Sequence, residues 1–225
     1  MRCVTCLRAM GLRYVLTRCG DDLLSVSVAS PAHAQALAAH LRETGTWLEV
    51  VAGIDSVVVR FDAAVLDGED AAQQMDKAMS GGVPALQESG EWLEIPVVYG
   101  GEFGADFDEL CGELDLSRDE FIALHTGTEY RVDMVGFTPG FAFVGGLDER
   151  LRVPRRKQPR QRVEAGSVGI ADGRTGLYAL ASPGGWSLIG RTPYPLFDAQ
   201  AAEPFALQAG MRVRFRAIAA DEFET

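Results

Sequence analysis

The strand-sized segments in the second half of the chain most strongly constrain its fold. Residues 93–225 contain no long helical repeat, and short apolar runs are separated there by Gly, Pro and Asp. Many short strands at this spacing are typical of a barrel or a sandwich, not of a parallel sheet. We expect strands at 94–99, 130–135, 167–171, 176–180, 186–189 and 211–218, with a hairpin turn at Asp172-Gly173.

The first half has a different order of elements. Its pattern predicts strands at 12–17, 23–28, 47–51 and 56–61, and helices at 31–43 and 69–80. Ser30 and Pro31 supply an N-cap and a first-turn proline for the first helix. This order indicates a small two-layer α/β sandwich with helices on one face of a mostly antiparallel sheet. The chain is therefore expected to be α+β, with an N-terminal extension (1–11), an α/β sandwich domain (12–92) and a strand-rich domain (93–225).

Composition excludes several classes of protein. The formal net charge of −11 and the isoelectric point near 4.7 argue against general nucleic-acid binding. No apolar run reaches the roughly 18 residues of a membrane span, and the N-terminus lacks a signal-peptide pattern, so we expect a cytoplasmic protein. Cys3 and Cys6 form a CxxC pair without a second pair at metal-site spacing. We therefore predict reduced thiols in a frayed extension and no metal site.

The segment RVPRRKQPRQR, residues 152–162 and hereafter the basic segment, carries six basic side chains in eleven positions. Pro154 and Pro159 restrict the backbone around its arginines, so their guanidinium groups could be aimed at a ligand. The planar fork of arginine binds carboxylate or phosphate through two hydrogen bonds. An anion site, a patch that pairs with an acidic partner and a solvated loop are all compatible with this pattern.

One helix in the second half is well marked. Ser117 and Glu120 form a capping box, and the helix is expected to end near Gly127, with His125 in its last turn. The negative end of the helix dipole favours the imidazolium form of His125, which makes a helix-capping role the simplest interpretation. His33 and His40 share a face of the first helix, where packed histidines are favoured over a metal pair.

Four motifs of the second half resemble one family. They are LHTGTEYRV (124–132), GFTPGFAFVGGLDERLRVPRRKQPR (136–160), AGSVGIADGRTGLY (165–178) and SPGGWSLIGRTP (182–193). In this order they resemble the group of 5-oxoprolinase B subunits, also called allophanate hydrolase subunit 1, which is similar to carboxyltransferase subdomains C and D. The first half fits more loosely, and Ala179 stands where the family usually has proline.

The resemblance implies a fold, a reaction and partners. The expected fold is a small N-terminal α/β domain followed by a cyclophilin-like β-barrel over 93–225. The expected assembly joins an allophanate hydrolase subunit 2-like protein (the C component of the oxoprolinase) and a LamB/YcsF-type protein (its A component), and it hydrolyses 5-oxoproline to glutamate with ATP. The family also includes a Kip-type inhibitor of a sensor histidine kinase, so a regulatory role is the alternative, as is hydrolysis of allophanate or another amide.

The expected chemistry assigns candidate site residues. Opening the lactam requires positive charge for the substrate carboxylate and the developing oxyanion. We predict Arg155 and Arg160 as anion contacts, with His125 as acid or base. Predicted substrate contacts are Arg156, Phe141, Ser167, Thr175 and Trp186, beside the structural glycines Gly140, Gly169, Gly184 and Gly185. The sequence contains no GxxxxGK[ST] phosphate loop, so ATP is expected on a partner or across an interface with it, and the chain alone is expected to be inactive.

Overall fold

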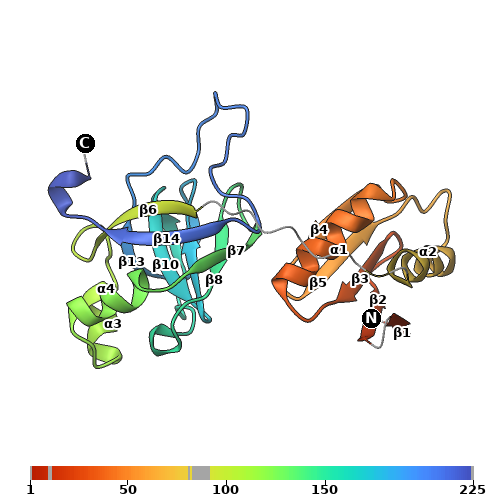
Figure 1. Ribbon diagram of the computed structural model, residues 1–225, viewed down its shortest axis with the longest axis horizontal. Helices are drawn as coiled ribbons and strands as arrows, with labels where there is room; N and C mark the ends of the chain where they lie inside the picture. Colours follow the sequence, from red (N-terminus) through yellow and green to blue (C-terminus); the bar gives the residue numbers. More distant parts are fainter. Residues whose placement is uncertain (1, 10–11, 81, 83–91, 224–225) are drawn as a thin grey trace. The chain divides into compact units, whose positions relative to one another are not determined.

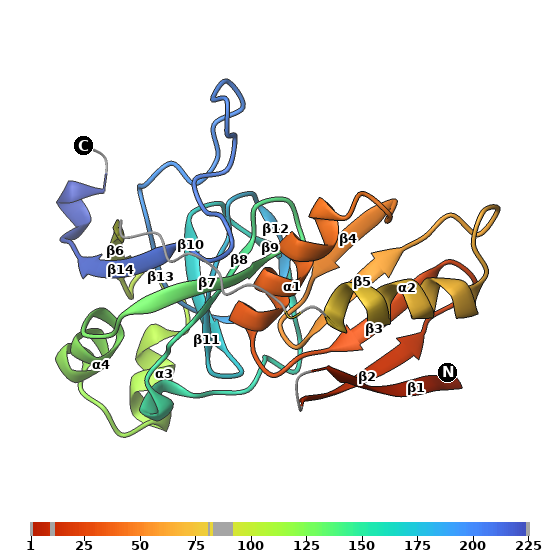
Figure 2. The same cartoon turned by 45° about the vertical axis from the view of Figure 1, so that its right-hand side comes forward.

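The computed structural model describes residues 2–9, 12–80, 82 and 92–223, with side chains described from Tyr14 onward. It divides into two compact units, Met1–Gln87 and Glu88–Thr225. The first unit is an α/β layer structure and the second is a closed barrel (Figures 1 and 2). This arrangement confirms the predicted α+β class, with the α/β sandwich preceding the barrel.

The first unit is an antiparallel sheet covered by two helices. The strand order is β1-β2-β3-β5-β4. The strands are β1 (Arg2–Ala9), β2 (Leu12–Arg18), β3 (Leu23–Ser27), β4 (Glu49–Ala52) and β5 (Ser56–Arg60). Helices α1 (Pro31–Glu43) and α2 (Gly68–Ser80) pack on one face, where alternate residues such as Leu24, Val57 and Val59 are fully buried. Period-two burial is what a sheet with one covered face requires.

The predicted N-terminal extension is wrong for residues 2–9. These residues form β1 and pair with β2 from Arg2↔Arg18 to Ala9↔Leu12. The free edge of β2 offers unpaired backbone N–H and C=O groups, and β1 satisfies them. The side chains of Cys3 and Cys6 lie outside the described part of the chain, so the prediction for their thiols stays a prediction.

The two histidines of α1 make local hydrogen bonds. The Nε2 of His33 lies 3.3 Å from the hydroxyl of Tyr14, and the Nε2 of His40 lies 2.9 Å from the carbonyl of Ala78 at the end of α2. Among the described residues, no group of three His, Cys, Asp or Glu side chains could hold a metal ion. The hydrogen bonds to Tyr14 and Ala78 show that both histidines are packed within the first unit, the arrangement that the sequence favours.

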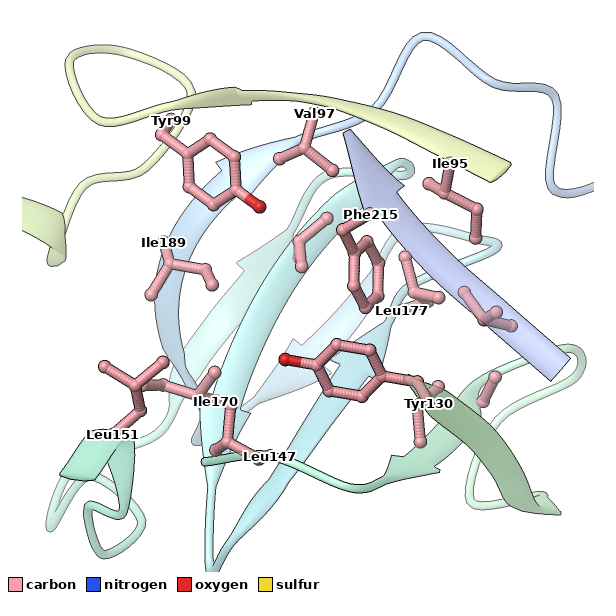
Figure 3. Packing of buried hydrophobic residues seen from close by; sticks show 14 of the residues in the cluster. Ile95, Val97, Tyr99, Tyr130, Leu147, Leu151, Ile170, Leu177, Ile189 and Phe215 are labelled. Atoms are coloured by element: carbon pink, nitrogen blue, oxygen red, sulfur yellow. The ribbon is translucent and has the colours of Figure 1, made fainter. Parts of the chain in front are cut away.

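The second unit is a closed barrel in the order β10-β11-β8-β7-β14-β6-β13. Its strands are β6 (Trp92–Tyr99), β7 (Tyr130–Val135), β8 (Ala142–Gly145), β10 (Ser167–Ala171), β11 (Arg174–Leu177), β13 (Ser187–Arg191) and β14 (Arg212–Ala217). The pair β6–β14 is parallel, whereas the other described pairs of the barrel are antiparallel. Ile95, Tyr130, Ile170, Leu177 and Phe215 converge in the interior (Figure 3).

Short helices lie between or after the strands. Helices α3 (Phe107–Glu113) and α4 (Arg118–Thr126) separate β6 from β7, and the 3-10 turns η1 (Glu149–Leu151) and η2 (Ala220–Glu222) complete the unit. The predicted capping box of α4 is confirmed, because the Ser117 side chain accepts from the Glu120 N–H and the Glu120 carboxylate accepts from the Ser117 N–H. No helix in the described part of the chain is long and apolar enough to cross a membrane.

A second apolar layer covers the outside of the barrel. It consists of Phe141, Phe143, Tyr178 and Trp186, hereafter the outer aromatic cluster, whose rings meet edge to face at 4.8–5.7 Å. A Cβ at Gly176 would lie 2.7 Å from Phe141 and 3.0 Å from Trp186. Glycine on the outer face of β11 is therefore what allows these rings to lie against the barrel.

A glycine substitution tests how tightly this layer packs. At Gly184, on β12 (Ser182–Gly184), an added Cβ would overlap the phenol of Tyr178, so we expect Gly184→Ala to destabilise the protein by about 1–3 kcal/mol. The matched control is Gly112→Ala in α3, where nothing lies within 4 Å, and there we expect a gain of about 0.5–1 kcal/mol. Urea unfolding measures both, and equal stability of the two variants would contradict the packing described.

Candidate functional site

The basic segment follows η1 and runs across the outside of the barrel into β9 (Arg160–Val163). Strand β9 pairs antiparallel with β12, from Ser182↔Val163 to Gly184↔Arg160. Within the irregular part, the N–H of Arg156 donates to the carbonyl of Gly185 at 2.8 Å. The backbone of the segment is therefore held at Arg156 and at Arg160.

The carboxylate of Asp106 holds two arginines of this segment. It accepts hydrogen bonds from Nη1 of Arg156 at 2.6 Å and from Nη1 and Nη2 of Arg160 at 2.9 and 2.7 Å. It also accepts from the N–H of Leu188 at 2.7 Å, and the Asp106 N–H donates back to the Leu188 carbonyl at 3.0 Å. Asp106 is only 4% exposed, so these hydrogen bonds replace the water that its carboxylate would otherwise bind.

Asp106 is a residue that the sequence reasoning missed. It belongs to a run of acids around α3 (Asp106, Asp108, Glu109 and Glu113), and such a run is by itself typical of a solvated helix face. Its arginine partners lie 50 and 54 positions away, and no local motif marks such a pairing. The usable signal was weaker, namely that an acidic chain with one concentrated basic segment must place carboxylates against it.

The third arginine makes different contacts. The Nε of Arg155 donates to the carboxylate of Asp172 at 2.9 Å, in the β10–β11 hairpin turn. Its guanidinium carbon lies 5.7 Å from the ring centroid of Trp186, within cation–π range. The Arg155 side chain remains 57% exposed, so a ligand can reach it.

A pocket of about 460 Å³ lies beside these arginines. Its lining residues are Asp106, Glu109, Leu110, Glu113, Val153, Pro154, Arg155, Arg156, Lys157, Gln158 and Ser187. One group of these residues comes from the basic segment. Another comes from α3 and from Asp106, which directly precedes it. The structure thus places Arg155 and Arg156 at a cavity, while Arg160 shares with Arg156 the carboxylate of Asp106.

His125 lies elsewhere, in the barrel interior. It is fully buried, with Nδ1 2.7 Å from the Tyr99 hydroxyl and Nε2 3.1 Å from the Thr175 hydroxyl. Burial lowers the pKa of His125 to about 3, so the predicted imidazolium form is wrong. The desolvation penalty outweighs the helix dipole, because the ring packs among Tyr130 and Phe215 and is not exposed at the helix end.

The other predicted contacts separate into three places. Thr175 is hydrogen-bonded to His125 inside the barrel, and Phe141 and Trp186 are 1% and 4% exposed within the outer aromatic cluster. Ser167 is buried on β10. Of the four glycines, Gly185 lies against the basic segment through Pro159, while the following three are close-packing positions: Gly140 against Phe205, Gly169 against Trp186 and Gly184 against Tyr178. The structure therefore brings together the three arginines and Trp186, but it does not bring His125, Ser167 or Thr175 to the pocket lining.

Comparison with known proteins identifies the family. The model of the carboxyltransferase domain, subdomain C and D, matches residues 5–207. This chain belongs to that family. One relative, the B subunit of 5-oxoprolinase from Bacillus subtilis (strain 168), is 34% identical over 232 residues, which cover 95% of this chain and 97% of the relative.

Solved structures of related proteins agree with the fold. The crystal structure of TTHA0988 superposes with a TM-score of 0.76 at 32% identity, covering 89% of this carboxyltransferase-family chain but only 41% of that chain. The Kluyveromyces lactis urea carboxylase gives a TM-score of 0.78 over 100% of this chain and 23% of its own. At 17% identity, the second match shows the fold alone.

Removing the charge of Asp106 tests its role in the pocket. Asp106→Asn leaves two arginines without their buried counterion, so we expect a loss of about 2–4 kcal/mol in the free energy of unfolding. Asp108→Asn is the matched control, since the Asp108–Arg118 pair is exposed and is expected to contribute less than about 1 kcal/mol. Urea unfolding compares them, and an Asp106 variant as stable as the Asp108 variant would contradict this assignment.

The buried imidazole predicts a specific pH dependence. With a pKa of about 3 in the folded state against 6.5 in the unfolded state, His125 stays neutral when folded. Its contribution to stability is complete above the unfolded value and is lost as the pH falls toward the folded value. NMR from about pH 8 to about pH 5 should show that the His125 imidazole, assigned by the loss of its signal in His125→Gln, does not titrate. A normal titration of that signal would refute the buried placement.

Proposed function

We propose that this chain is a subunit of an ATP-dependent 5-oxoprolinase complex that hydrolyses 5-oxo-L-proline to L-glutamate. The observation that supports it most is the pocket beside the Asp106-held arginines, in a chain whose relative is named as a 5-oxoprolinase subunit. The reaction breaks the lactam C–N bond, water supplies the new carboxylate oxygen, and the nitrogen becomes an amine. This chain would bind and orient the substrate through its carboxylate.

Three cationic side chains at the pocket suit that task. Arg155, Arg156 and Lys157 line the cavity in sequence. Asp106 fixes Arg156 in place, so little side-chain entropy is lost when an anion binds to it. The structure offers no titratable acid or base among the predicted catalytic residues here, because His125 is buried in the barrel. Proton transfer is therefore assigned to a partner.

ATP and the remaining groups are also assigned to partners. The pocket lining includes three carboxylates, from Asp106, Glu109 and Glu113, which disfavour a polyphosphate. We propose that an allophanate hydrolase subunit 2-like protein and a LamB/YcsF-type protein complete the site, and that this chain is inactive alone. The match to TTHA0988 is compatible with this, since it covers only 41% of that chain and leaves room there for a further component.

The proposal is tested by reconstitution. We expect Arg156→Ala to lower kcat/KM for glutamate release from 5-oxoproline and ATP at least about tenfold, mainly through KM, because a carboxylate contact is lost. The matched control is Arg162→Ala, since Arg162 is paired with Glu164 and does not line the pocket. Equal kinetics of the two variants would remove Arg156 from the site. A wild-type mixture that releases no glutamate, while this chain inhibits a histidine kinase, would replace the proposal with the regulatory alternative.

A further inference from the structure

The pocket beside Asp106 has charges of opposite sign on its two contributing segments. Helix α3 supplies Glu109 and Glu113, which are one helical turn apart. The basic segment supplies Arg155, Arg156 and Lys157. With Asp106, the lining carries as many carboxylates as cations, so the cavity is neutral overall and strongly dipolar.

Asp106 pairs directly with Arg156, whereas the α3 carboxylates Glu109 and Glu113 are not paired with the basic segment among the described residues. Within the described part of the chain, the carboxylate partners of Arg155 and Arg156 are Asp172 and Asp106, and no ion pair within 4.0 Å joins Glu109 or Glu113 to the basic segment. The Nε of Arg156 is buried and has no hydrogen-bond partner among described residues. Space therefore separates the two groups, and its volume of about 460 Å³ falls in the roughly 300–1,000 Å³ range of small-molecule sites.

The charge arrangement selects among ligand classes. A polyanion would gain contacts with the cations but would face Glu109 and Glu113 without compensation. A simple cation would be repelled by the arginines. A molecule that carries an ammonium and a carboxylate satisfies both groups at once. We propose that this pocket binds an open-chain α-amino acid as its zwitterion, with the carboxylate on the basic segment and the ammonium at Glu109 and Glu113.

This inference rests on the proposed function for the identity of the amino acid. The nitrogen of 5-oxoproline is an amide and carries no charge, whereas ring opening creates the ammonium of L-glutamate. The α3 carboxylates therefore recognise the group that the reaction forms. The pocket prefers the open-chain product to the cyclic substrate, and bound glutamate is expected to inhibit the complex by competing with 5-oxoproline.

Calorimetric titration of the isolated 225-residue chain tests the preference directly. The probes are L-glutamate, glutarate, which has the same two carboxylates without the amine, and 5-oxo-L-proline. We expect L-glutamate to bind about threefold to tenfold more tightly than either of the others. Glu113→Gln should remove most of that preference while leaving glutarate binding equal or stronger. The matched control is Glu203→Gln, an exposed position outside the pocket lining, which should keep the preference.

Three results would overturn the inference. They are no binding of L-glutamate, equal affinity for glutarate and L-glutamate, and an unchanged preference in both Glu113→Gln and Glu109→Gln. The experiment needs neither partner nor ATP, so it is independent of turnover. If the preference holds but the reconstituted complex releases no glutamate, the proposed function fails and the amino-acid site stands. If the complex releases glutamate but the chain shows no preference for L-glutamate, the proposed function stands and the amino-acid site fails.

Discussion

The hydrogen bonds of the buried Asp106 carboxylate are the interactions on which the placement of Arg156 and Arg160 depends. They join three segments that are distant in sequence: the turn before α3, the basic segment and β13. A single carboxylate accepts four hydrogen bonds there, three of them from guanidinium groups. Charge-assisted bonds of this kind are among the strongest in proteins, and they hold cationic side chains at a fixed place in an acidic chain.

The outer aromatic cluster provides the rigid base for this arrangement. Trp186 packs against the barrel where glycine leaves room, and it also contacts the guanidinium of Arg155. Gly184 likewise allows strand β12 to lie close to Tyr178. Strand β12 pairs with β9, which contains the end of the basic segment. Glycines and arginines that are separate motifs in the sequence are thus one packed layer in the structure.

Much of the fold follows from local rules that the sequence displays. The capping box at Ser117, the proline-initiated helix at Pro31 and the hairpin turn at Asp172-Gly173 are each confirmed. The missed strands of the barrel unit break those rules: β9 is mostly polar, β12 contains a proline, and β8 is a short apolar run without alternation. Tertiary pairing forms them despite weak local preference.

The candidate site was predicted only in part. Some of its features follow from neighbouring residues in the sequence, whereas others depend on contacts between distant segments. Proline spacing and charge density singled out Arg155, Arg156 and Arg160, of which Arg155 and Arg156 line the pocket and Arg160 does not. The position of His125 on its helix suggested a charged imidazole. Its burial depends on how the whole barrel packs, and this burial keeps the imidazole neutral. Asp106 could not be found from spacing, since only the folded chain brings it to Arg160.

A double-mutant cycle between Asp106→Asn and Arg160→Met measures the central interaction most directly. The account predicts a coupling of at least about 1.5 kcal/mol in the free energy of unfolding, because the pair is bidentate and largely removed from water. Additive effects of the two substitutions, with a coupling near zero, would contradict it.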